Sequence, residues 1–225
     1  MPVQSSARRQ QATSSSDRAF ADIACHSSEE ILAHPRFVTA RTDFVNAVLG
    51  LYEGDAFLNR LLLEAGRTVI FTVIMCLNAC HEEADRTTWP TMGLLKQQMK
   101  QFGLASPRRI EDLVARLIHS GFLQSIPSKR DGRVRLLAPT AKMFAADQDW
   151  LAAHYLPLHV MFPAPGYSQP MQRDPSFQRA QRLVAMAGAQ IMAGNPAMSS
   201  IAIKSALAPR AGAARTGNSR PISPQ

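Results

Sequence analysis

The stretch "SPRRIEDLVARLIHSGFLQSIPSKRDGRVRLLAPT", residues 106–140, combines an amphipathic helix with a basic hairpin and decides the fold. Ser106 is a good N-cap, and Pro107 suits the first position of a helix. Gly121 stands where a helix ends, and Phe122 returns the chain to the core. The apolar residues of the helix recur at three- and four-residue spacing, namely Ile110, Leu113, Val114, Leu117 and Ile118. These signals predict a helix over about 106–120 with one buried face.

The opposite face of this helix carries planar cationic donors. At 100° per residue, Arg108, Asp112, Ala115 and His119 share it, flanked by Arg109 and Arg116. Arginines on a rigid helix can reach base edges in the major groove, and the N–H groups of its first turn attract phosphate. We therefore predict that Arg108, Arg109, Asp112 and Arg116 read bases, with Ser106 at the N-terminus of the same helix.

The residues after this helix predict a hairpin. "LQSIP" and "RVRLL" can pair as antiparallel strands around "SKRDG", with Val134 and Leu136 on one side and Arg133 and Arg135 on the other. The hairpin spans about 124–137. Its exposed cations are candidates for the DNA backbone or the minor groove, namely Lys129, Arg130, Arg133 and Arg135.

The residues before this helix predict a partner helix. In "TMGLLKQQMKQFG", residues 91–103, one face carries Met92, Leu95, Met99 and Phe102, and Gly103 suits a left-handed residue after the helix. Two short helices joined by a tight turn form a helix-turn-helix pattern, and a hairpin directly after it makes a winged helix. We expect this unit over 89–140.

The rest of the chain predicts further helices and two disordered ends. We expect disorder over 1–28, a helical segment over 29–88, further helices over 141–193, and a disordered basic tail over 194–225. The middle helical segment includes a strongly apolar helix from about 56 to 84. The expected fold class is mainly α: a winged helix-turn-helix with a small β-hairpin wing, packed among additional helices.

The charge of the chain is concentrated in the predicted winged helix. The 225 residues carry a net charge of +8. Between Trp89 and Arg135, nine basic residues face three acidic ones, a net charge of +6. Such a concentration indicates an anionic partner, and double-stranded DNA fits a winged helix.

Residues 57–140 resemble the MarR-type winged-helix transcriptional regulators. "DGRVRLLAPT" is similar to the Asp-x-Arg, strand and Leu-Thr of that family's wing, with Asp131 and Arg133 in matching places and Pro139 in place of the usual Leu. The resemblance implies a homodimer on a near-palindromic site, with helix 106–120 in the major groove and the wing on the backbone or minor groove. It also implies that Asp131 orients a neighbouring arginine rather than touching DNA.

Other kinds of site find little support. Cys76 and Cys80 lie four residues apart, but no second Cys/His cluster completes a zinc site, and we expect buried thiols. No catalytic set or cofactor motif is present, so we expect neither an enzyme nor a bound cofactor or metal. An effector pocket among Trp89, Trp150 and Tyr155 is possible, although core packing explains these residues more simply.

The sequence also indicates where the protein is located and leaves two alternative functions open. The uncharged run between Arg67 and His81 is too short for a membrane span, and we expect a cytoplasmic protein. A winged-helix protein–protein adaptor would keep the fold without binding DNA. A replication- or partition-type DNA-binding protein would use the same fold on repeats near an origin.

Overall fold

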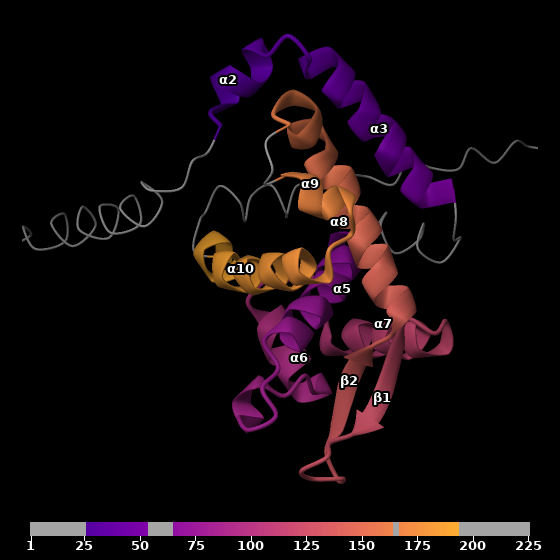
Figure 1. The fold of residues 1–225 in the computed structure, drawn as a ribbon. Coiled ribbons are helices and arrows are strands. Elements are labelled where there is room, and N and C mark those ends of the chain that lie inside the picture. Colours follow the sequence, from indigo (N-terminus) through magenta and orange to yellow (C-terminus); the bar gives the residue numbers. More distant parts are fainter. Residues whose placement is uncertain (1–25, 54–64, 164–166, 194–225) are drawn as a thin grey trace, which may run out of the picture.

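The computed structural model describes residues 26–53, 65–163 and 167–193. This part of the chain is mainly helical and contains one two-stranded antiparallel hairpin. The helices α2 (Ser28–Ala33) and α3 (Phe37–Glu53) lie at one end of the molecule, and the hairpin lies at the other (Figure 1). The expectations of disorder for 1–28 and 194–225 fall outside the described residues, except at positions 26–28, where α2 begins.

The core forms around α5 (Ala65–Ala79), which is apolar on nearly all sides. Ile70 and Ile74 of α5 are each 1% exposed and pack with side chains of the neighbouring helices. The helix expected over 56–84 ends at Ala79, earlier than predicted, and its start lies outside the described residues. The reason is local: the polar stretch after Cys80 folds into turns and a short 3₁₀ helix, η1 (Arg86–Thr88).

Two further helices follow as predicted, α6 (Met92–Lys100) and α7 (Pro107–His119). Gly103 and Gly121 both have positive φ, +64° and +76°, so each glycine closes a helix in the left-handed conformation. The hydroxyl oxygen of Ser106 accepts a hydrogen bond from the N–H of Arg109 at 3.4 Å and caps α7. The local signals at both helix ends are therefore confirmed.

The hairpin consists of β1 (Leu123–Pro127) and β2 (Arg135–Pro139), with Ile126 opposite Leu136. β1 has the predicted bounds, but β2 begins two residues later than predicted. The later start follows from Asp131, which binds the backbone N–H groups of the next residues. Its side chain accepts from the N–H of Arg133 at 3.2 Å, and its carbonyl oxygen accepts from the N–H of Val134 at 2.9 Å. The expected alternation over residues 133–136 is confirmed in the exposure of the side chains, because Arg133 and Arg135 are exposed, Val134 is half-buried and Leu136 is buried. Only the strand assignment differs, since Arg133 and Val134 belong to the loop.

Thr140 connects the hairpin to α8 (Ala141–Met161), a helix of 21 residues. Its hydroxyl donates to the carbonyl of Gly121 at 2.7 Å and accepts from the N–H of Met143 at 3.4 Å. α8 then packs along α3 at the opposite end of the molecule, where the ring of His154 meets the edge of Phe44. One helix therefore runs from the hairpin to α3 (Figure 1).

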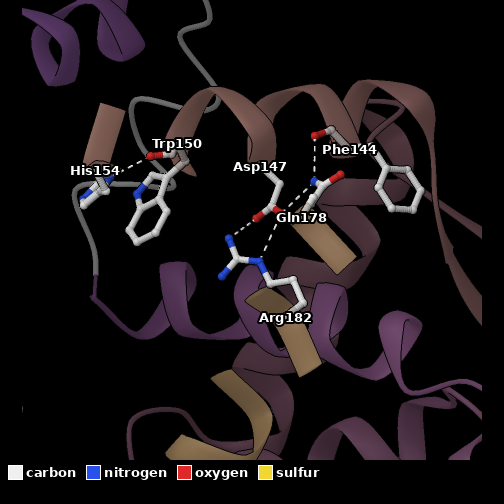
Figure 2. A network of polar contacts seen from close by, with 6 residues as sticks. All are labelled: Phe144, Asp147, Trp150, His154, Gln178 and Arg182. Carbon is white, nitrogen blue, oxygen red and sulfur yellow. Dashed lines mark hydrogen bonds and ion pairs between the residues drawn. The ribbon is translucent and has the colours of Figure 1, made fainter. Parts of the chain in front are cut away.

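A buried polar network joins α8 to the last described helix, α10 (Pro175–Ala193), which follows the short α9 (Ser168–Met171). Asp147 is 1% exposed, and its carboxylate accepts from Arg182 Nε at 3.0 Å, from Arg182 Nη2, and from Gln178 Nε2 at 2.8 Å. Figure 2 shows Arg182 and Gln178 reaching the same carboxylate. The Arg182 guanidinium also lies 5.6 Å from the ring centroid of Trp150. This network fixes α10 against α8.

None of the helices in the described ranges is long and apolar enough to cross a membrane.

Candidate nucleic-acid interface

The exposed face of α7 carries the side chains that the sequence assigned to base reading. Arg108, Arg109, Asp112 and Arg116 are all exposed, while Ile110 and Leu117 on the opposite face are at most 1% exposed. Within the described part of the chain, these three arginines form no ion pair. α7 therefore presents three free guanidinium groups to solvent on a helix whose other face is fixed in the core.

The N-terminus of α7 faces a hollow formed with α6. The hollow has a volume of about 910 Å³, and its lining includes Lys96, Lys100, Ser106 and Arg109. Lys96 is paired with Glu111 of α7, whereas Lys100 is exposed. Cations and the N–H groups of a helix N-terminus in one concave site suit a phosphate.

A smaller cleft lies between α7 and the start of α5, and it shares Arg109 with the first hollow. Its volume is about 220 Å³, and its lining includes Arg67, Arg109, Asp112 and Arg116. The sequence argument did not include Arg67, because the stretch between it and α7 is long and gives no local sign that the two meet. The cleft adds a further cationic residue to the region around α7.

The hairpin loop, residues 128–134, carries three more exposed cations, Lys129, Arg130 and Arg133. In the described ranges, none of these three side chains forms an ion pair. The loop is nonetheless ordered at its base, where the N–H of Ser128 donates to the carbonyl of Val134 at 2.9 Å. The loop and α7 lie at the same end of the molecule, with β1 leading from one to the other (Figure 1).

Arg135 differs from the other cations of the hairpin. Its Nε donates to the hydroxyl of Ser125 at 3.3 Å, and its Nη2 donates to the carbonyl of the same residue. The guanidinium therefore lies across the two strands instead of extending from the loop. A contact of Arg135 with DNA stays a prediction.

Asp131 pairs with an arginine that the sequence did not single out. Its Oδ2 forms an ion pair with Arg86 of η1, 45 positions earlier in the chain. The guanidinium of Arg86 also lies 5.2 Å from the ring centroid of the buried Trp89. No local pattern links residues so far apart, and only the folded chain brings η1 beside the hairpin loop.

Both described cysteines lie where the pKa of the thiol is raised. Burial raises the pKa of Cys76 to about 11, and it also raises the pKa of Cys80. A thiol with a raised pKa is protonated at neutral pH and is a poor nucleophile. The expected burial is confirmed for Cys76, which is 2% exposed, whereas Cys80 is only half-buried.

The resemblance of residues 57–140 to the MarR-type regulators also stays a prediction. No family model matches the chain, and no curated protein or solved structure is significantly similar to it.

Proposed function

We propose that the protein is a transcriptional regulator that binds double-stranded DNA through a winged helix. In this proposal α6 and α7 form the helix-turn-helix, α7 enters the major groove, and the hairpin formed by β1 and β2 is the wing. The wing lies on the backbone or in the minor groove. The order of these elements and their location at one end of the molecule support it.

The observation that carries the proposal is the free cationic surface at that end. Six exposed side chains make no ion pair in the described ranges, namely Arg108, Arg109, Arg116, Lys129, Arg130 and Arg133. A solvated surface usually mixes both signs of charge, and unpaired cations repel one another. Neutralisation by the phosphates of a duplex removes this repulsion and releases counterions.

The proposed assembly is a homodimer on a near-palindromic site. Two copies would place two α7 helices in successive major grooves, about 34 Å apart. A bidentate contact between an arginine and a guanine discriminates against other bases by about 1–3 kcal/mol, so several such contacts in each copy would define a site.

The test is fluorescence anisotropy with random and genome-selected duplexes over a salt series. A regulator binds its selected site at least ~10³-fold more tightly than random DNA. The double variant Arg108→Gln with Arg133→Gln should lose this affinity. The control, Arg36→Gln with Arg41→Gln, makes the same change of charge at exposed residues of the α2–α3 end and should not.

The other outcomes separate the alternatives. Equal affinity for selected and random duplexes would reduce the protein to a non-specific DNA binder. Selected sites that form iterated repeats near an origin would indicate replication or partition. No measurable duplex binding would contradict the proposal and favour the protein–protein adaptor.

A further inference from the structure

The ion pair between Arg86 and Asp131 joins η1 to the hairpin loop, and it neutralises the negative charge of Asp131. We propose that Arg86 is a positioning residue that keeps the Asp131 carboxylate away from the loop cations, so that those cations stay available for phosphates. The inference rests on the proposed function, since it concerns the same loop. In this proposal Arg86, which lies outside the winged helix, determines how many cations of the wing are available to bind DNA.

The side chain of Arg86 is 65% exposed, and two contacts position its guanidinium, the ion pair with Asp131 and the ring of Trp89. Its guanidinium lies 5.2 Å from the ring centroid of Trp89, which is 3% exposed and donates from Nε1 to the carbonyl of Glu83 at 3.3 Å. The turn around it is closed by side chains. Asp85 accepts from the N–H of Thr87 at 2.9 Å, and the Thr88 hydroxyl accepts from the N–H of Glu82 at 2.9 Å.

Asp131 would otherwise pair inside its own loop. It is the one acid among residues 128–134, and Lys129, Arg130 and Arg133 lie within two positions of it. Opposite charges at contact distance on a protein surface attract one another, and such an exposed pair contributes up to about 1 kcal/mol. With Arg86 present, Oδ2 of Asp131 pairs with the Arg86 guanidinium and Oδ1 accepts from the N–H of Arg133, so both carboxylate oxygens are engaged.

A second contact between the same two segments supports the arrangement. The N–H of Leu137 in β2 donates to the carbonyl of Pro90 at 2.7 Å. A two-stranded hairpin is only marginally stable by itself. The segment 86–90 therefore holds the hairpin at two places, at the loop through Arg86 and along β2 through Pro90.

The experiment measures how DNA affinity depends on salt for Arg86→Gln, for Asp131→Asn and for the double variant, with Arg41→Gln as the control. In Arg86→Gln the freed carboxylate should neutralise one loop cation. The slope of log K against log salt should then become shallower, by at most about 0.9, the value of one phosphate contact. The double variant has no carboxylate to release and should regain the wild-type slope. Arg41→Gln should keep that slope throughout.

The double variant decides between the possible roles of Arg86. If Arg86 itself bound a phosphate, the double variant would keep the shallow slope of Arg86→Gln, and the proposal would be overturned. A purely structural role would lower the affinity of both variants without restoring the slope, which would also overturn it.

Amide hydrogen exchange separates this inference from the proposed function, because it needs no DNA. The N–H of Arg133 should exchange several-fold faster in Arg86→Gln than in the wild type, since its acceptor turns away. Unchanged exchange would overturn the positioning role even if DNA binds. A wild-type protein that binds no duplex would overturn the proposed function, and the exchange rates would still test the positioning of Asp131.

Discussion

Individual arginines at the proposed interface differ in how the fold holds them. Arg108 extends from the first turn of α7, a helix that is capped at Ser106 and buried along its other face. Arg130 extends from the hairpin loop, where its backbone N–H donates to the hydroxyl of Ser128 at 3.3 Å. A side chain on a fixed helix can select one base, whereas one on a loop suits a phosphate.

Substitution of these two arginines by alanine should therefore have different effects. Arg108→Ala should cost about 1–3 kcal/mol on the selected site and relax the preference at one base pair. Arg130→Ala should weaken selected and random DNA alike and make the salt slope shallower by about 0.9. Anisotropy on a panel of single-base variants of the site measures both. The same loss of preference in both variants would contradict this division of roles.

His154 predicts a dependence of stability on pH. Burial lowers its pKa, and its ring stacks on Trp150 at a centroid distance of 3.6 Å. The unfolded chain then takes up a proton more readily than the folded protein. The stabilisation is complete above the ordinary histidine pKa of about 6.5 and is lost as the pH falls through the lower folded-state value.

Urea unfolding between pH 7.5 and 5 tests this expectation. His154→Asn keeps a donor for the carbonyl of Trp150, which lies 2.8 Å from His154 Nδ1, but has no ring to titrate. The variant should lose less free energy of unfolding over this range than the wild type. His119→Asn, at an exposed position, is the control and should follow the wild type. Parallel curves for all three proteins would refute the assignment.

Among the helices and strands, the sequence predicted those features that are determined by residues close together in the chain. The caps at Ser106 and the glycines at 103 and 121 are local signals, so the bounds of α6 and α7 and the existence of the hairpin followed from them. The start of β2 was missed because the side chain of Asp131 competes with strand pairing. The contacts of Arg86 and Arg182 depend on packing between distant elements, which no local pattern encodes.

The network between α8 and α10 gives a prediction at this scale. Arg182→Met leaves the Asp147 carboxylate buried with Gln178 as its remaining side-chain donor, and this should cost about 3–5 kcal/mol of stability. The double variant with Asp147→Leu removes both charges and should be much closer to the wild type. Urea unfolding of the two single variants and the double variant completes the cycle. Additive losses in the double variant would show that the pair does not act as a unit.

The whole molecule has two distinct ends. The proposed interface occupies one, and at the other α3 exposes apolar side chains, among them Val38 at 64% and Leu49 at 55%. α8 and α10 lie between the ends and are joined by the Asp147 network. The proposed contact with DNA is therefore separate in space from the exposed face of α3.

The homodimer proposed for DNA binding predicts a dependence on the spacing of half-sites. Insertion of about five base pairs between the halves of the selected palindrome turns them to opposite faces of the duplex. Affinity should then fall toward that of a single half-site, and an insertion of about ten base pairs should recover part of it. Gel-shift titration with the three duplexes measures this. Equal affinity for all three would contradict a rigid dimer.

The continuity of α8 has a mechanical consequence. The helix starts at the Thr140 cap, which is bonded to the last residues before the hairpin, and continues to the α2–α3 end, with Pro157 inside its last two turns. A rod of 21 residues is about 32 Å long, so a tilt of about 5° at the hairpin displaces the far end by about 3 Å. α8 therefore couples the two ends of the molecule, because a rotation imposed on the hairpin is passed along this helix to the α2–α3 end.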